Sequence, residues 1–386
     1  FFSAYLVSVS LKMAASKTHL IPETPTRRDG YIENINIEGE EVIVSPAYLR
    51  KEIPMTQKAH NTIEWGMETI KDIIEGRDKR VLAIVGPCSI HNVDSAKEYA
   101  QKLVKLAEQV QDSVYIIMRV YFEKPRTNVG WKGLINDPHL DGTYDIDLGL
   151  RIARKLLIEI NEMGMPCAGE ALDLITPQYM QELFVYTAIG ARTTEAATHR
   201  NMASGLTSAV GFKNATSGDL DVAINAILAA NAPHVFKSIN LQGNVCIVKT
   251  KGNPLCHVIL RGGDSGPNFS AEHIAKYEAK LEKSKTPVRL VVDCSHGNSN
   301  KNHENQPKVL ADLGNQIAGG NNSIIGTMIE SNLGPGRQNI PEDKSQLKWG
   351  VSVTDACVDW ETTVEMLTSF AAQIQPIIKA RQMAGQ

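Results

Sequence analysis

Ionisable and reactive side chains follow a series of short apolar runs along this 386-residue chain. Strands of one parallel sheet or barrel end at a common edge, and chemistry gathers there. A single charged residue at such a position is usually only solvated, but eight of the runs each lead into an ionisable or reactive residue. In chain order they lead to Cys88, Arg119 followed by Lys124, Glu170, Arg192, Lys213, Arg261, Asp293 followed by His296, and Glu330.

Six of the residues near these ends are cations that would meet at one mouth if the runs are neighbouring strands. Converging cations repel one another unless an anion compensates, and Arg binds phosphate and carboxylate through paired hydrogen bonds. Their number exceeds what one phosphate needs, so they predict a substrate with several negative charges, or two phosphorylated substrates. The alternative is that they face solvent separately. The six are Arg119, Lys124, Arg126, Arg192, Lys213 and Arg261.

A second group of residues has the chemistry of metal ligands. It combines one thiol, one imidazole and two carboxylates, a set that suits Mn, Fe, Co or Zn better than an all-oxygen magnesium site. The four are Cys88, His296, Glu330 and Asp355, and no two of them lie in a compact local motif. Each could therefore have a simpler role. Cys88 could be a buried thiol and His296 a hydrogen-bonding loop residue, while Glu330 could be a solvated strand end and Asp355 a helix N-cap.

The apolar runs indicate the scaffold that must position these groups. Near-continuous apolar strands are typical of a parallel sheet covered on both faces. The turn at 242–244 is so short that the sixth and seventh runs predict an antiparallel hairpin. Removing it leaves eight strands, and the predicted fold is α/β, a (β/α)8 barrel with an inserted hairpin. The ten runs are 81–85, 114–120, 166–172, 186–191, 208–213, 234–239, 245–249, 256–261, 288–293 and 323–330.

Amphipathic segments between the runs predict helices. Thr56 can cap one helix, and Ser95 with Glu98 would form a capping box for another. Apolar residues at helical spacing predict further helices near 146–160, 220–228 and 360–378. The predicted organisation is an atypical or non-native leader (1–12), an N-terminal arm and helix (13–79) with a short strand at 40–44, and a barrel (80–386) with the hairpin at 234–250.

Composition narrows the class of protein. The chain has 40 Lys and Arg against 43 Asp and Glu, for a formal net charge of −3, and its aromatic residues do not interleave with basic runs. We therefore expect no nucleic-acid partner. No apolar stretch approaches 18 residues, so we expect no membrane partner either. Six cysteines without a CxxC pair indicate reduced thiols and a cytoplasmic protein. The segment Gly334-Pro-Gly-Arg337 is expected to be a turn without chemistry.

Several blocks resemble type I 3-deoxy-D-arabino-heptulosonate 7-phosphate (DAHP) synthases of the aromatic-amino-acid-regulated class. They run in order from about residue 30 to 380, and only 1–12 has no family counterpart. The Lys124-Pro-Arg-Thr127 block separates this family from the related 3-deoxy-manno-octulosonate 8-phosphate synthases. The blocks are 86–91, 118–127, 130–139, 169–170, 190–195, 211–214, 260–263, 295–299, 328–331 and 354–357.

The resemblance implies a reaction and roles for these residues. Phosphoenolpyruvate, D-erythrose 4-phosphate and water would give DAHP and phosphate, the first step of the shikimate pathway. The metal ligands would be Cys88, His296, Glu330 and Asp355, with Lys124, Cys88 and His296 catalytic. Phosphoenolpyruvate would meet Arg119, Lys124, Glu170, Arg192, Lys213 and Arg261. Erythrose 4-phosphate would meet Arg126 and Thr127, with Pro125 shaping the loop. Lys124 would protonate or steady the new alkoxide, although a water at the metal could equally be the acid.

The resemblance also implies regulation and assembly. The arm and hairpin would form subunit contacts of a homodimer or homotetramer and an effector site for an aromatic amino acid. Thr207, Ser208 and Phe236 lie in segments that resemble the effector region. The hairpin could instead be only structural. Two other functions stay open: the related octulosonate phosphate synthase, and a non-catalytic metabolite-sensing barrel, which we would expect to have lost a ligand or a cation.

Overall fold

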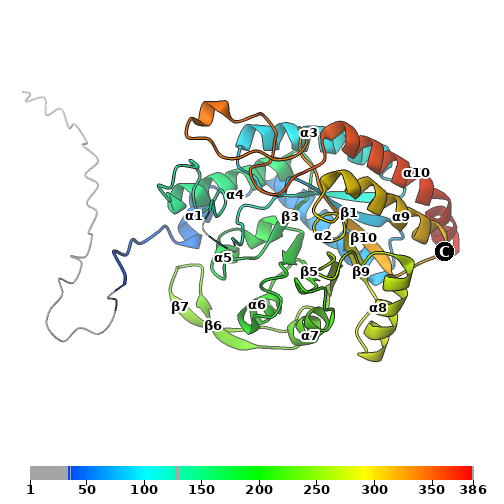
Figure 1. The fold of residues 1–386 in the computed structure, drawn as a ribbon. Coiled ribbons are helices and arrows are strands. Elements are labelled where there is room, and N and C mark those ends of the chain that lie inside the picture. Colours follow the sequence, from blue (N-terminus) through cyan, green and yellow to red (C-terminus); the bar gives the residue numbers. More distant parts are fainter. Residues whose placement is uncertain (1–33, 35, 127, 129, 385–386) are drawn as a thin grey trace, which may run out of the picture. The chain divides into compact units, whose positions relative to one another are not determined.

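The computed structural model describes residues 34, 36–126, 128 and 130–384. The chain forms two compact units, residues 1–43 and 44–386, and the second holds every named helix and strand. In it, eight parallel strands close into a barrel in the order β1-β10-β9-β8-β5-β4-β3-β2 (Figure 1). The predicted (β/α)8 barrel is therefore confirmed.

The barrel strands lie within two residues of the apolar runs that predicted them. Their side chains are almost all buried, as expected for strands covered by helices outside and by packed side chains inside. The strands are β1 Val81–Gly86, β2 Val114–Arg119, β3 Cys167–Glu170, β4 Tyr186–Ile189, β5 Ala209–Lys213, β8 Cys256–Leu260, β9 Leu290–Asp293 and β10 Ile324–Glu330.

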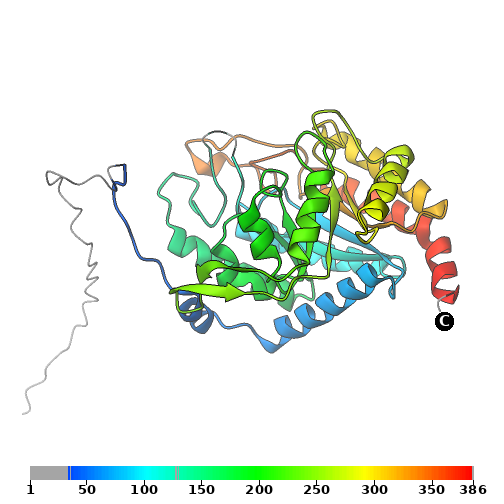
Figure 2. The ribbon, with the colours of Figure 1, turned by 90° about the horizontal axis from the view of Figure 1, so that it is seen from below.

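The predicted hairpin is also present. Strands β6 (Val235–Ile239) and β7 (Val245–Lys249) pair antiparallel in a sheet of their own, set apart from the barrel strands (Figure 2). At the hairpin tip, the Leu241 carbonyl accepts a hydrogen bond of 2.6 Å from the Ala47 amide, which is in the first helix of this unit. The insertion is thus tied to the N-terminal helix.

Ten α-helices surround the barrel in the described residues. Helix α2 is capped as predicted, because the Thr56 Oγ1 accepts a hydrogen bond from the Ala59 amide. Helix α10 packs on α9 and on α3, as Figure 1 shows. The helices are α1 Pro46–Glu52, α2 Gln57–Glu75, α3 Val93–Val110, α4 Ile146–Glu162, α5 Thr176–Met180, α6 Ala197–Ala203, α7 Asp221–Ala230, α8 Ala271–Lys283, α9 Gln306–Ala318 and α10 Trp360–Ala384.

Two local predictions are wrong. Ser95 does not cap α3: the cap is Asn92, whose Oδ1 accepts from the Ser95 amide at 2.8 Å. An Asn one turn earlier satisfies the free amides of the helix start, and Ser95 falls inside the helix. Residues 40–44 form no strand, because Val44 bonds to side chains instead of a strand partner. Its amide donates to Asp147 and its carbonyl accepts from Tyr179.

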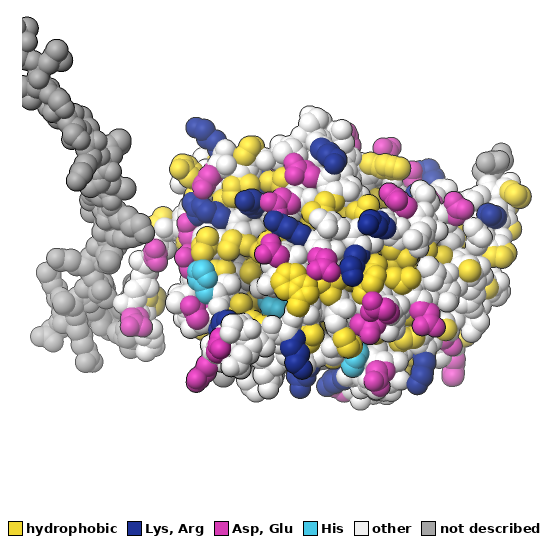
Figure 3. All heavy atoms as spheres, turned by 90° about the horizontal axis from the view of Figure 1, so that it is seen from above, with side chains coloured by type: hydrophobic (Ala, Val, Ile, Leu, Met, Phe, Trp, Pro, Cys, Tyr) yellow, Lys and Arg dark blue, Asp and Glu magenta, His cyan; other side chains and the backbone are white. Residues whose placement is uncertain are grey.

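Charged side chains of both signs are mixed on one face of the molecule (Figure 3). On the face shown in Figure 3, Lys and Arg alternate with Asp and Glu, in keeping with the near-neutral net charge. In the described residues, no helix is both long enough and apolar enough to cross a membrane.

Candidate active site and metal centre

A cavity of about 420 Å³ is lined by residues at and just beyond the carboxyl ends of the barrel strands. Parallel strands bring residues that are distant in sequence to one rim. Eight of the nine predicted substrate-binding residues line this cavity, and the ninth, Thr127, lies outside the described residues. The eight are Arg119, Lys124, Pro125, Arg126, Glu170, Arg192, Lys213 and Arg261.

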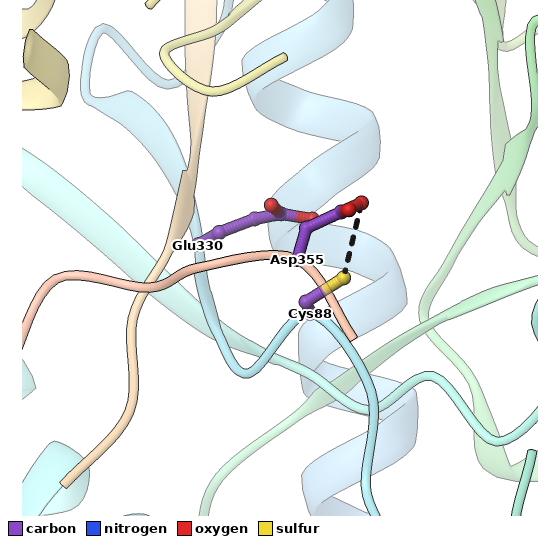
Figure 4. Close-up of side chains that lie close together, drawn as sticks. All are labelled: Cys88, Glu330 and Asp355. Carbon is purple, nitrogen blue, oxygen red and sulfur yellow. Dashed lines mark hydrogen bonds between the residues drawn. The ribbon is translucent and has the colours of Figure 1, made fainter. Parts of the chain in front are cut away.

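Three of the four predicted metal ligands form a compact cluster. Ligand atoms of Cys88, Glu330 and Asp355 all lie within 4.8 Å of one another. Gly86 of β1 pairs with Glu330 of β10, so Cys88, two residues farther on, stands beside that carboxylate. Asp355 arrives from the loop before α10, and its Oδ2 is 3.6 Å from the Cys88 Sγ (Figure 4).

The fourth predicted ligand, His296, lies at the edge of this cluster. Its Nε2 is 3.8 Å from the Glu330 Oε1, and its Nδ1 is 2.9 Å from the Asp293 Oδ2. A carboxylate close to Nδ1 favours this orientation of the ring, which turns Nε2 toward Glu330. The imidazole is therefore oriented for coordination from the Glu330 side.

Asp293 is a central residue of the site to which sequence reasoning assigned no role. Its buried carboxylate contacts the Lys213 Nζ at 2.8 Å as well as His296. Burial alone would raise the pKa of Asp293, but Lys213 and His296 hold it well below its ordinary value. Asp293 thus joins a predicted phosphate-binding cation to a predicted metal ligand. The sequence could have indicated this role, because Asp293 ends a buried strand and lies three residues before His296.

Glu330 is held on both carboxylate oxygens. Arg119 donates to Oε1 at 3.0 Å and Ser295 donates to Oε2 at 2.8 Å. The buried Gln306 side chain bonds both the amide and the carbonyl of Glu330, each at 2.9 Å. Burial would raise the pKa of Glu330, but His296, Arg119 and Lys124 outweigh it and lower the value to about 2. Glu330 is therefore ionised, and it is held in place by Ser295 and Gln306, to which the sequence analysis assigned no role.

Lys124 lies against Cys88. Its Nζ is 3.2 Å from both the Sγ and the carbonyl oxygen of that residue. Burial and Glu330 raise the pKa of the Cys88 thiol to about 11. Burial would lower the pKa of Lys124, yet the surrounding Cys88, Glu330 and Glu170 groups raise it. Lys124 is therefore an ammonium at neutral pH, beside the predicted metal ligands.

The donor set fits a divalent cation of the Mn, Fe, Co or Zn class. It offers one sulfur, one imidazole nitrogen and two carboxylates, and the buried Glu330 is already ionised. Asp355 is not used as a helix cap. Helix α10 begins at Trp360, and the Asp359 Oδ1 accepts from the Thr362 amide. The described residues thus form a site that could hold a metal ion.

A separate apolar cavity of about 460 Å³ lies between α6, the hairpin and the loop after β3. Of the three predicted effector residues, only Phe236 lines it. Ser208 is buried and bonds the Thr187 Oγ1 at 2.7 Å, while Thr207 is exposed. The structure therefore does not gather the three residues in one cavity. The other lining residues are Leu174, Thr198, Asn201, Met202, Val235, Lys237, Ser238 and Ile247.

Residues 52–368 match the model of the DAHP synthetase I family. The chain belongs to the DAHP synthetase I family. It is 51% identical over 350 residues to the Tyr-sensitive phospho-2-dehydro-3-deoxyheptonate aldolase of Escherichia coli (strain K12), covering 91% of this chain and 98% of the relative. The Phe-sensitive form from that strain is 49% identical, with the same coverage.

A solved structure gives the same assignment. Phospho-2-dehydro-3-deoxyheptonate aldolase from Francisella tularensis SCHU S4 superposes with a TM-score of 0.86 and 51% identity, covering 88% of this chain and 99% of the other. Membership of the DAHP synthetase I family confirms the resemblance that the motifs indicated. In a (β/α)8 enzyme the catalytic residues lie at the carboxyl ends of the barrel strands, where this cavity is located.

Proposed function

We propose that this member of the DAHP synthetase I family condenses phosphoenolpyruvate with D-erythrose 4-phosphate and water, giving DAHP and phosphate. One observation carries the proposal: six cations line a single cavity beside a cluster of metal-ligand residues. Two phosphorylated substrates would supply the negative charge that such a cavity needs. The assignment of individual residues to each substrate is part of the proposal.

The electrostatics of the cavity support binding of more than one anionic group. Arg119 is paired with Glu330, and Lys213 with Asp293, so both are held rigidly in place. Burial lowers the pKa of Arg261, which means that its charge is held where solvent stabilises it poorly. A bound phosphate or carboxylate would compensate that cost. We assign phosphoenolpyruvate to Arg119, Lys124, Glu170, Arg192, Lys213 and Arg261.

The reaction then follows from positioning and charge. Arg126, with Pro125 and Thr127, would hold the phosphate of erythrose 4-phosphate, so that the two polyanions meet despite their repulsion. When bound, the metal polarises the aldehyde oxygen. The enol carbon attacks the aldehyde carbon, and Lys124 Nζ donates a proton to the developing alkoxide. Water adds at the phosphate-bearing carbon, and phosphate departs with the electron pair of the C–O bond.

We propose that the metal is Mn, Fe, Co or Zn, held by Cys88, His296, Glu330 and Asp355. The three mutually close ligand atoms and the Asp293-oriented imidazole support this set. Cys88→Ala should lower both metal content and rate, whereas Cys246→Ala, which removes a thiol from the hairpin, should change neither. Full metal content and full rate in Cys88→Ala would show that the ligand set is wrong.

A single assay tests the activity. Chelator should abolish phosphate release and Mn should restore it, and phosphate should appear only when both substrates are present. Turnover of arabinose 5-phosphate in place of erythrose 4-phosphate would point instead to the octulosonate phosphate synthase. Binding of phosphoenolpyruvate without any turnover would favour a metabolite-sensing barrel.

We further propose feedback inhibition by an aromatic amino acid bound in the apolar cavity at Phe236. The cavity is large enough for an aromatic ring, and curated relatives are named for sensitivity to Tyr or Phe. Phe236→Ala should keep the uninhibited rate and lose the inhibition. Titration of Phe, Tyr and Trp into the assay measures it, and no inhibition of the wild type by any of the three would exclude this regulation.

We propose a homodimer or homotetramer in the cytoplasm. The hairpin exposes Val235 by 67%, Val245 by 80% and Ile247 by 70%, and a second copy could cover these apolar side chains. All six cysteines are free, which suits a reducing compartment.

A further inference from the structure

The substrate cavity continues into a second space of about 500 Å³, here called the outer hollow. Arg192, Arg261 and His296 are among the residues that line both, so the two spaces adjoin. Beyond these shared residues, the outer hollow reaches Lys301 and Arg337, which do not line the substrate cavity.

The outer hollow carries an excess of positive charge. Four lining side chains have a fixed positive charge: Arg192, Arg261, Lys301 and Arg337. Two lining side chains have a carboxylate, Asp264 and Asp355, and the second of these belongs to the metal-ligand cluster. Among the described residues, no carboxylate lies within ion-pair distance of Lys301 or Arg337. Cations in a concave space concentrate the field there and attract an anion.

Lys301 is held at the outer hollow by a strained turn. The backbone of His296, Asn300 and Lys301 is left-handed, with φ of 55°, 53° and 59°. Non-glycine residues adopt this conformation at a cost and keep it only where the surroundings enforce it, often at functional sites. The Lys301 amide donates to the His296 carbonyl at 2.8 Å, so the turn connects the predicted metal ligand directly to this cation.

Arg337 is fixed by its chain neighbours. The Gly336 amide donates to the Cys357 carbonyl at 2.8 Å, and the Gln338 amide donates to the Ser352 carbonyl at 2.7 Å. Both partners lie on the segment that also carries Asp355. The turn around Arg337, for which the sequence predicted no chemical role, is therefore held by backbone hydrogen bonds against the segment that carries Asp355.

We propose that the outer hollow is a phosphate subsite, in which Lys301 and Arg337 receive the inorganic phosphate that leaves the substrate cavity. The inference rests on the proposed function, since phosphate is a product of that reaction. Phosphate freed near Arg192 and Arg261 meets further cations in the adjoining space, so it can move outward without losing compensating charge. Arginine and lysine are suited to such a dianion.

The test separates this subsite from the substrate site by filling the latter first. Inorganic phosphate is titrated calorimetrically into the manganese-loaded full-length protein with saturating phosphoenolpyruvate and no erythrose 4-phosphate. The variant is K301A/R337A. The matched control is K276A/K283A, which removes two positive charges from α8, away from both spaces. A separate titration with phosphoenolpyruvate alone shows whether the proposed substrate binds at all.

We expect saturable phosphate binding to the wild type and the control, weakened about fivefold in K301A/R337A, with phosphoenolpyruvate affinity unchanged. Product inhibition by phosphate should weaken in parallel. Equal phosphate affinity in both double variants would refute the proposed subsite. The absence of saturable phosphate binding to the wild type would refute it as well. So would an equal loss of phosphoenolpyruvate affinity in K301A/R337A, because the two cations would then belong to the substrate site. Failure of phosphoenolpyruvate to bind the wild type would instead count against the proposed function.

Discussion

At the scale of single residues, the site depends on two buried carboxylates with different partners. Glu330 is held by Arg119 and Ser295 and belongs to the predicted metal-ligand cluster. Asp293 is held by Lys213 and faces the imidazole of His296. Breaking a buried ion pair by removing one charge leaves the other uncompensated, which is costly. These pairs therefore fix the geometry of the rim as much as they contribute charge.

Asp293→Asn tests this role. The amide keeps the size of the side chain but removes the charge that orients His296 and pairs with Lys213. We expect metal affinity to fall by about 10- to 100-fold, as is usual when a group behind a metal ligand is lost. Chelator competition measures the affinity, and steady-state kinetics should show a parallel fall in kcat/KM.

The control for Asp293→Asn is Asp343→Asn, the same chemical change on an exposed loop. It should bind metal as the wild type does. If Asp293→Asn also kept wild-type metal affinity, the orienting role of Asp293 would be refuted.

Glu123 gives a pH dependence of stability. It is buried beside Thr176, and burial, with Asp173, raises its pKa from 4.5 to about 8. The folded state therefore keeps a proton that the unfolded state loses, so this residue lowers stability as pH rises from about 4.5 through 8. Glu123→Gln should match the wild type near pH 4 and exceed its free energy of unfolding by at least about 1 kcal/mol at pH 8.5. Calorimetric melting at both pH values measures this, and equal pH dependence in the two proteins would contradict it.

At the scale of elements, α2 shows how a helix outside the β/α repeat docks on the barrel. A Cβ at Gly66 would lie 2.8 Å from the Val185 Cγ1 and 3.1 Å from the Pro166 Cβ. Both neighbours adjoin the starts of barrel strands, so α2 makes its close approach at the end of the barrel opposite the catalytic rim. Gly66 thus allows α2 to approach the barrel closely, and it is not part of a turn.

Gly66→Ala should therefore destabilise the protein, although alanine is normally the better helix residue by up to about 1 kcal/mol. Overpacking costs about 1–3 kcal/mol in such cores, and the neighbours here are short, branched or cyclic side chains that cannot move aside. Denaturant unfolding measures the difference.

Gly314→Ala on α9 is the matched control. The three atoms nearest to the added methyl all belong to the far end of the Gln373 side chain, which can rotate away. We expect it to be neutral or stabilising. A Gly66→Ala variant as stable as Gly314→Ala would show that α2 packs less closely than the structure indicates.

At the scale of the whole molecule, the hairpin carries three exposed aliphatic side chains, Val235, Val245 and Ile247. Residues along β6 and β7 largely alternate between more and less exposed positions. Because its tip is bonded to α1, this surface is held in a defined position. A rigid apolar face is suited to association with a second copy.

Val245→Asp should weaken that association. A carboxylate on a face that is buried between subunits would have to lose its hydration without gaining a partner. We expect analytical ultracentrifugation to show a shift toward smaller species. Met383→Asp, the same kind of change at a side chain exposed by 75% on α10, should leave the distribution unchanged. If both variants had the same distribution of oligomers, the hairpin would not be part of the subunit interface.

Much of the fold was predictable because the relevant signals are local. A barrel strand buried on both faces needs an unbroken apolar run, and a hairpin needs a short turn, so all ten strands could be identified from the sequence. The cations and ligands at the strand ends were predictable for the same reason, since parallel strands must end at one rim. The cap of α3 was misplaced because Asn92 and Ser95 are both good caps, and only the course of the chain selects between them.

What the tertiary structure decided concerns groups that meet only after the barrel closes. Asp293 contacts Lys213 because the closed barrel brings the ends of β9 and β5 together. Gln306 bonds Glu330 because the first turn of α9 lies beside the last residue of β10. Lys301 and Arg337 share a hollow because a strained turn and a bonded loop hold them there. These long-range contacts are not encoded by any local spacing in the chain, unlike the Asp293–His296 contact between residues three apart. The sequence thus determined which chemical groups reach the rim, and the closed barrel determined which of them pair, which orient a ligand, and which remain available to an anion.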